Sequence, residues 1–269
     1  MKLVKSIVFH AQFRENMPAI AFPGGVATYG ALIKAVGAAV EALRTFDLAP
    51  GTAVMLDLRN PIHHTAMMFA LALMGLPSAS VGTAFVAEKA GFLPKLFLTD
   101  RDDTKSAGVR QVRVDDRWFA TDAGAQPDYA KLLSLPGFSA PDDIVRYVYS
   151  SGTTGHPKCV ALTQATLEHR VLGGQAVQGW WMHGPAALNM MGFSTIVGST
   201  VPLTAHSQGV VLCYAGSTAE ALQMINLFGV AGLVLSVGQL QPFFALLGNQ
   251  PPPRTLKFMA IVGAKISAA

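Results

Sequence analysis

The sequence is poor in charged residues and almost devoid of cysteine. Of its 269 residues, 13% are charged and 51% are hydrophobic, and the mean hydropathy is +0.38. A chain this apolar can bury a large core, which excludes a disordered or collagen-like protein. Its two cysteines, Cys159 and Cys213, are too few for a disulfide framework or a cysteine metal site. This favours a reducing, cytoplasmic location.

The sequence also lacks an uninterrupted apolar run long enough to cross a bilayer. Its longest apolar tract, 66–81, is broken by glycine, proline and serine, and it falls short of the roughly 20 residues that a spanning helix needs. Residues 1–16 have a basic start but no small-residue cleavage site, so they do not resemble a signal peptide. The sequence predicts no transmembrane segment and leaves peripheral membrane contact open.

Clustered positive charge is missing as well. The net charge is +4, but lysine and arginine are spread singly along the chain. Residues 110–118 interleave acids with bases, and no basic stripe alternates with stacking aromatic residues. Because nucleic-acid binding depends on such surfaces, the sequence predicts no nucleic-acid partner.

Strand-like and helix-like segments alternate along most of the chain. The predicted strands are 52–58, 77–81, 95–100, 109–116, 144–151, 210–216, 230–236 and 256–263. The predicted helices are 28–43, 60–74, 85–92, 163–181, 217–228 and 238–248. Several helices begin with a cap signal, such as Thr28, Asn60-Pro61, or Ser217 with Glu220. This order predicts an α/β fold of doubly wound, largely parallel sheets flanked by helices.

The last eight residues shape the expected domain organisation. "VGAKISAA" (262–269) contains the end of a strand, a glycine turn and barely the first turn of another helix. A few helical residues cannot stabilise their own ordering. We therefore expect a first α/β subdomain at 1–180 and the start of a second, truncated one at 181–269. Some apolar surface would then pack on structure outside this sequence.

A glycine- and hydroxyl-rich loop, "SSGTTGHPK" (150–158), follows one predicted strand. Gly152 and Gly155 permit backbone angles that let amide N–H groups converge on one point. The loop's hydroxyls and its positive charge come from Ser150, Ser151, Thr153, Thr154 and Lys158. With a strand before it and a helix after it, the loop is expected at the carboxyl end of the sheet, where such folds bind ligands. It predicts a polyphosphate cradle, although its spacing fits neither a Walker A loop nor a dinucleotide fingerprint; an ordinary surface turn is the alternative.

The stretch "YSSGTTGHPKCVALT" (149–163) resembles the phosphate-loop signature of the adenylate-forming superfamily. That superfamily includes acyl-CoA synthetases, adenylation domains of peptide synthetases, and luciferases. Residues 151–155, Pro157 and Lys158 match the family pattern outright. Weaker resemblance at 9–32, 48–81 and 260–267 extends over the chain. All 269 residues are thus similar to roughly the first half of a family member.

The resemblance implies an ATP-dependent acid–thiol ligase, most like an acyl-CoA synthetase. In that reaction a carboxylic acid attacks Mg-ATP to give an acyl-adenylate and pyrophosphate, and a thiol, commonly coenzyme A, then takes the acyl group. The resemblance implies that the ATP phosphates are bound by Ser150, Ser151, Gly152, Thr153, Thr154, Gly155 and Lys158. It places Phe193 and Ser194 near the acyl pocket, with plain core packing as the alternative for Phe193.

The catalytic residues and the magnesium ligand are expected outside this sequence, in the missing C-terminal half of the enzyme. We therefore expect these 269 residues alone not to form acyl-adenylate.

Departures from the family pattern keep other interpretations open. Cys159 replaces a glycine, and Gln164 and Ser194 stand where many members carry histidine. The alternatives are a peptide-synthetase-type adenylation domain and a degenerate phosphate-binding module without catalysis. A metal site at His63-His64 is not expected because adjacent residues face different sides of a helix. Cys159 lacks a neighbouring base for nucleophilic catalysis, and a homodimer is left open.

Overall fold

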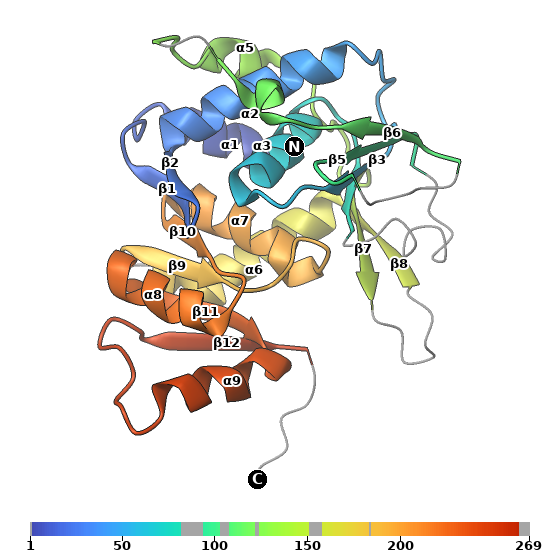
Figure 1. Ribbon diagram of the computed structural model, residues 1–269. Helices are drawn as coiled ribbons and strands as arrows, with labels where there is room; N and C mark the ends of the chain where they lie inside the picture. The colour runs from blue at the N-terminus through green and yellow to red at the C-terminus, as the bar shows by residue number, and fades with distance from the viewer. Residues whose placement is uncertain are drawn as a thin grey trace.

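Two mixed β-sheets flanked by helices form the architecture of the computed structural model (Figure 1). The structure describes residues 2–81, 94–102, 108–121, 124–150, 158–182 and 184–263. Within these ranges each sheet has six strands. The predicted α/β fold is confirmed. The predicted helix at 85–92 lies outside the described residues.

The first sheet has the strand order β6-β5-β3-β4-β7-β8. Its strands are β3 (Val54–Asp57), β4 (Ser78–Ser80), β5 (Leu96–Thr99), β6 (Arg110–Arg113), β7 (Ile144–Ser150) and β8 (Lys158–Thr163). All neighbours are parallel except the antiparallel pair β7–β8. The helices in the first part of the chain are α1 (Lys2–Ala11), α2 (Tyr29–Arg44), α3 (Pro61–Leu73), the 3-10 turn η1 (Asp116–Phe119) and α5 (Tyr129–Ser134). Helix α3 packs on β3 and β4, and α2 packs on α3. Strands β3, β4 and β5 are buried throughout, as expected for a sheet covered on both faces.

The second sheet has the order β12-β11-β9-β10-β1-β2. Its strands are β1 (Pro18–Phe22), β2 (Gly25–Thr28), β9 (Ala186–Asn189), β10 (Val211–Tyr214), β11 (Val230–Ser236) and β12 (Phe258–Val262). Its helices are α6 (Gln164–Met182), α7 (Ile196–Gln208), α8 (Thr218–Phe228) and α9 (Val237–Leu247). In Figure 1, α8 and α9 lie on the outer side of this sheet, while α6 and α7 lie toward the first sheet. The largest hydrophobic core lies between the sheets and includes buried residues of α1, α2, α3, α6 and α7.

Local capping explains why the predicted helices begin and end where they do. The Thr28 side chain accepts a hydrogen bond from the backbone of Ala31 at 3.2 Å, and Asn60 caps α3 with proline at the first helical position. Ser217 and Glu220 form the predicted capping box of α8. Helix α3 stops before Gly75, whose φ of 72° suits glycine and whose missing Cβ leaves room for the carbonyl of residue 137.

Several elements were not predicted, and one expectation is wrong. Strand β8 separates the glycine-rich loop from α6, so the loop connects two antiparallel strands and does not lead directly into a helix. The elements α1, β1, β2, β9, α7 and α5 were not predicted from the sequence either. Strands of four or five residues are too short to show a periodicity of their own. Helix α7 looks too polar to be buried, yet its Thr200, Thr204 and Ser207 hydroxyls donate to carbonyls of their own helix.

The two sheets cannot be separated by dividing the chain at a single residue. Residues 18–28 form β1 and β2 and join the sheet that is otherwise built from 186–262. The division into subdomains at 180/181 stays a prediction. No helix in the described ranges is both long and apolar enough to cross a membrane.

Candidate functional site

The predicted phosphate loop begins at the carboxyl end of β7. Ser150 is the last residue of β7 and Lys158 the first of β8, and the two are paired across the antiparallel ladder. Because β7 runs parallel to β4, the loop begins at the edge where parallel sheets bind ligands. Ser151, Gly152, Thr153, Thr154 and Gly155 lie outside the described residues, as does the side chain of Ser150. Their phosphate-binding role stays a prediction.

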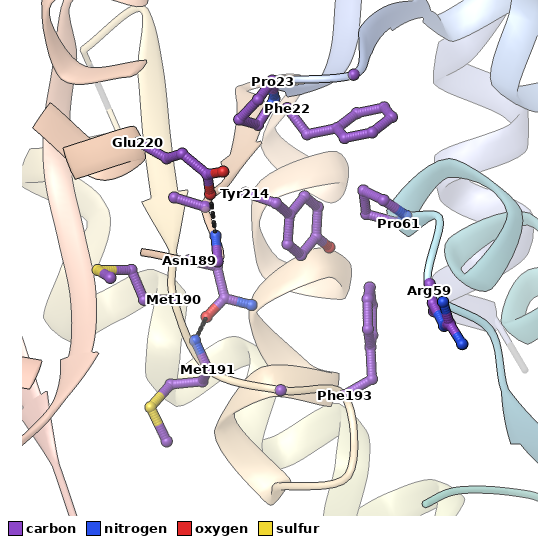
Figure 2. A pocket seen from close by; sticks show the side chains of 14 residues that line it. Phe22, Pro23, Arg59, Pro61, Asn189, Met190, Met191, Phe193, Tyr214 and Glu220 are labelled. Carbon is purple, nitrogen blue, oxygen red and sulfur yellow. Dashed lines mark hydrogen bonds between the residues drawn. The ribbon is translucent and has the colours of Figure 1, made fainter. Parts of the chain in front are cut away.

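A cavity of about 510 Å³ opens between the two sheets (Figure 2). Its wall is formed by the ends of β1, β9 and β10 with the segments that follow them, and by the start of α3. Strands β1, β9 and β10 are parallel neighbours, so their carboxyl ends meet at the same edge of the second sheet. The cavity therefore lies where an α/β fold gathers its ligand-binding residues.

Phe193 forms an aromatic wall of this cavity. Its ring stacks on His64 of α3, with ring centroids 4.0 Å apart and 7° between the planes. On the second sheet it stacks on Tyr214 at 5.3 Å and 29°. Phe193 thus joins the two halves of the site, as Figure 2 shows for the tyrosine side. Ser194 follows in the same turn but does not line the cavity; the acyl-pocket role of both residues stays a prediction.

A buried cation holds the backbone of this turn. Arg146 of β7 is 2% exposed and donates to Ser78 Oγ at 2.9 Å, to Ser80 Oγ at 2.5 Å and to the Phe193 carbonyl at 2.9 Å. Burial lowers its pKa to about 10, so the guanidinium stays charged at neutral pH. Two acceptors on β4 and one in the turn after β9 therefore converge on one positive charge.

The hydrogen-bond directions around His64 follow from its partners. Its Nδ1 lies 3.0 Å from the Leu58 carbonyl, which only accepts, so Nδ1 carries the proton. Burial lowers the His64 pKa to about 3, so the ring is neutral at physiological pH and Nε2 accepts from the Ser80 hydroxyl at 2.7 Å. Arg146 thus donates to Ser80, Ser80 to His64, and His64 to Leu58. This series of hydrogen bonds fixes the His64 ring, on which Phe193 stacks.

The geometry supports neither a metal site at His63-His64 nor a nucleophilic role for Cys159. His63 stacks on Phe119 at 4.0 Å while His64 stacks on Phe193, so the adjacent histidines face different sides, as predicted. Over the ranges that the structure describes, no three His, Cys, Asp or Glu side chains gather as a metal site would require. Burial raises the pKa of the Cys159 thiol, which disfavours the thiolate that a nucleophile needs.

Three residues of the site were missed by the sequence analysis: Arg146, Asn189 and Tyr214. The arginine in the apolar strand "IVRYVYS" was the available signal, because a charged side chain in a buried strand needs a special environment. Asn189 and Tyr214 end strands that lie side by side only in the folded chain. Nothing in the local sequence marks them as neighbours.

The model of the family described as AMP-binding enzyme matches residues 9–269. The chain belongs to this AMP-binding enzyme family. The resemblance carried by residues 149–163 is therefore confirmed at the level of the family.

Curated relatives of this AMP-binding chain act on fatty acids. It is 28% identical over 144 residues to the long-chain-fatty-acid–CoA ligase FadD15 of Mycobacterium tuberculosis, covering 53% of this chain and 23% of that protein. It is 28% identical over 171 residues to the fatty acid–[acyl-carrier-protein] ligase ScoC of Streptomyces coeruleorubidus, covering 60% of this chain and 32% of that one. The matches thus span about a quarter to a third of these relatives.

Solved structures share the fold. O-succinylbenzoate coenzyme A synthetase (MenE) from Bacillus subtilis, in complex with AMP, superposes with a TM-score of 0.78 at 17% identity. The match covers 96% of this chain and 67% of that one. VinN superposes with a TM-score of 0.79 at 18% identity, covering 98% of this chain and 69% of that one. The two-sheet arrangement is therefore shared with MenE and VinN.

Proposed function

We propose that this chain is the N-terminal portion of an ATP-dependent ligase that converts a carboxylic acid to an acyl-adenylate and then passes the acyl group to a thiol, most simply coenzyme A. The family match over residues 9–269, with the glycine- and hydroxyl-rich loop between β7 and β8, carries the proposal. The named activities of FadD15 and ScoC support acyl activation, and FadD15 supports coenzyme A as the thiol.

In the first half-reaction a carboxylate oxygen attacks the α-phosphorus of ATP. A new P–O bond forms, the bond to the β-phosphate oxygen breaks, and pyrophosphate leaves with the electron pair. Loop amides, the hydroxyls of Ser150, Ser151, Thr153 and Thr154, and the charge of Lys158 would hold the β- and γ-phosphates. Their contribution is the electrostatic stabilisation of charge that grows on the leaving group.

Magnesium is proposed as the companion of ATP, as in the MenE complex with ATP and magnesium ion. The described residues gather no set of three His, Cys, Asp or Glu ligands for it. Within this chain the assigned role is therefore phosphate binding, and no step is attributed to the metal.

The acyl group is placed in the cavity beside Phe193. The cavity lies between the sheets, and Phe193 in its wall is fixed by His64, Tyr214 and Arg146. A rigid wall of this kind restricts the orientations of a bound acid, which brings its carboxylate closer to an attacking geometry. The two unpaired cysteines, Cys159 and Cys213, fit a cytoplasmic location for such an enzyme.

The test is carboxylate-dependent ATP–pyrophosphate exchange by the complete polypeptide that contains these residues. Replacing Thr153 or Thr154 by valine removes a phosphate-binding hydroxyl and keeps the side-chain shape. We expect the exchange rate to fall by about 10²–10³-fold, the usual loss for one preorganised donor. The dissociation constant of the carboxylate should stay within about twofold.

Thr45→Val is the matched control, because Thr45 lies on the far end of α2 and is exposed. Unchanged exchange in both loop variants would refute the assignment of the loop. Nucleotide binding by the complete polypeptide without exchange for any carboxylate would instead favour the degenerate phosphate-binding module.

A further inference from the structure

The solvent-facing side of helix α1 ends in an exposed aromatic pair. The buried face of this helix consists of Val4, Ile7, Val8 and Ala11. On the opposite face Phe9 is 47% and Phe13 is 73% exposed, and their ring centroids lie 5.6 Å apart, edge to face. Phe13 is the most exposed of the large hydrophobic side chains in the described part of the chain. Packing within the described residues therefore does not explain this pair.

The backbone after α1 holds the apolar side chains on one short stretch. The Phe13 N–H donates to the His10 carbonyl at 3.2 Å, so helical turn geometry continues past the last residue of the helix. The Met17 N–H then donates to the Arg14 carbonyl at 2.9 Å, and the Met17 side chain is also exposed. Residues 9–17 thus present three large apolar side chains to solvent.

The charges beside this aromatic pair are positive. The titratable residues of α1 are all basic, with no Asp or Glu among them: Lys2, Lys5 and His10. Lys2 is exposed two helical turns before Phe9 on the same face. The first carboxylate after the helix, Glu15, is half-buried and lies beside Tyr129 of α5, where burial and then this carboxylate raise the pKa of the phenol. One face of α1 therefore combines a basic end with an aromatic end.

The size of the aromatic pair favours a lipid surface over a protein partner. A phenylalanine side chain has about 200 Å² of surface, so at the exposed fractions given above the two rings offer roughly 240 Å². A stable protein complex buries about 800 Å² on each partner. A bilayer requires less, because a few apolar side chains can enter the boundary between headgroups and acyl chains while basic residues lie over anionic headgroups.

We propose that the α1 face, formed by Lys2, Lys5, Phe9, His10 and Phe13, docks on a membrane surface that contains anionic phospholipids. The two rings enter the boundary between headgroups and acyl chains, and the lysines lie against the lipid phosphates. Each of these two signals alone binds weakly, so docking needs both and is reversible. The proposal goes beyond the proposed function and does not depend on it.

Sedimentation of the complete polypeptide with lipid vesicles tests this proposal. Vesicles of phosphatidylcholine alone are compared with vesicles in which about a quarter of the lipid is phosphatidylglycerol. We expect the partition coefficient onto the anionic vesicles to be at least about tenfold higher at low salt. Raising the ionic strength to about 1 M, where the Debye length is about 3 Å, should remove most of this preference.

Substitutions on the α1 face separate its two signals. The double substitution Phe9→Ser and Phe13→Ser should reduce partitioning onto anionic vesicles at least about tenfold. The double substitution Lys2→Gln and Lys5→Gln should reduce the preference for anionic lipid to about threefold or less. Phe244→Ser is the matched control, because Phe244 on α9 is exposed to a similar degree as Phe9, and it should bind like the unaltered protein.

A tryptophan variant reports insertion directly. Phe13→Trp keeps an aromatic anchor, so it should bind, and brominated lipids should quench its fluorescence more than that of the unaltered protein. Thermal unfolding checks that each variant is folded; if the serine variant is not, the glutamine and tryptophan variants decide.

Two results would overturn the proposal: no binding of the unaltered protein to anionic vesicles at any lipid concentration, or unchanged binding by the folded serine variant. Dimers that form without vesicle binding and are abolished by the serine substitutions would assign the α1 face to a second copy of the chain and reject the membrane.

Discussion

The buried guanidinium of Arg146 offers the sharpest test of what holds the two sheets in register. Methionine at this position keeps much of the volume, removes the charge, and removes all three hydrogen bonds to Ser78, Ser80 and the Phe193 carbonyl. Lysine keeps the charge, but its single nitrogen cannot reproduce the planar fork that reaches three acceptors at once. The two substitutions therefore separate the contribution of the charge from that of the geometry.

The expected magnitudes follow from which groups lose a partner. In Arg146→Met the two serine hydroxyls can rotate to other acceptors or donors, whereas the Phe193 carbonyl is fixed in the turn and loses its donor. One buried unsatisfied acceptor costs about 1–3 kcal/mol, and the removed desolvation cost of the cation offsets part of the remaining loss. We expect a loss of about 2 kcal/mol for methionine. Lysine should cost more, about 3 kcal/mol, because it leaves a buried charge with poorer hydrogen bonding.

Chemical denaturation and thermal unfolding measure both values. In a chain of this size about 2 kcal/mol corresponds to a fall in Tm of roughly 4–8 °C. Arg44→Met is the control: Arg44 is 45% exposed and pairs with Glu41 at 3.3 Å, so its loss should change stability by less than about 0.5 kcal/mol. A lysine variant as stable as the unaltered protein, or a methionine variant more stable than it, would refute this reasoning.

Two further predictions concern pH and packing. Burial lowers the pKa of both His64 and His206 to about 3, whereas the unfolded residues take up protons below about pH 6.5. Stability should therefore fall as the pH drops from about 6.5 toward 3, by up to about 1.4 kcal/mol per pH unit for each histidine. In denaturation experiments, His64→Phe should roughly halve the slope of stability against pH between pH 6 and 4. An unchanged slope would contradict the conclusion that His64 is buried in its neutral form. Gly198→Ala in α7 would place a Cβ against the backbone of the turn that carries Phe193, so we expect a lower Tm and weaker carboxylate binding. Gly173→Ala in α6, where a Cβ meets nothing, should leave binding unchanged and raise stability by about 0.5–1 kcal/mol, and equal effects of the two substitutions would argue against the contact.

The parts of the fold that could be predicted are those specified by neighbouring residues. Thr28, Asn60-Pro61 and the Ser217–Glu220 box act within one helical turn, and each begins a helix where the sequence predicted one. Strand β1 is different, because Ile20 pairs with Leu212 from the far part of the chain. Its pairing is fixed by tertiary contacts, and a five-residue segment gives little local signal of them.

The same distinction separates the predicted and missed residues of the site. The loop at 150–158 could be proposed as a phosphate site because its glycines, hydroxyls and lysine are contiguous in sequence, and this role stays a prediction. Phe193 was proposed from a resemblance to the family pattern, and the structure adds the contacts that fix it. Asn189, Tyr214 and Arg146 belong to three different strands, and they come close to the Phe193 turn only where the edges of the two sheets meet.

A directional hydrogen bond from Arg146 to the Phe193 carbonyl joins the two sheets where their edges meet. The hydrophobic effect between two sheets has no preferred direction and by itself selects no single hydrogen-bonding geometry. The Arg146 fork, in contrast, fixes the first sheet to the backbone of the Phe193 turn through a hydrogen bond of 2.9 Å, and charge-assisted bonds of this kind are geometrically specific. Arg146 also lies four residues before Ser150, where the phosphate loop begins. One strand therefore carries the start of the predicted phosphate loop and positions the wall of the adjacent cavity, so the distance between the start of this loop and the cavity depends on the length of β7 and on the register that Arg146 enforces.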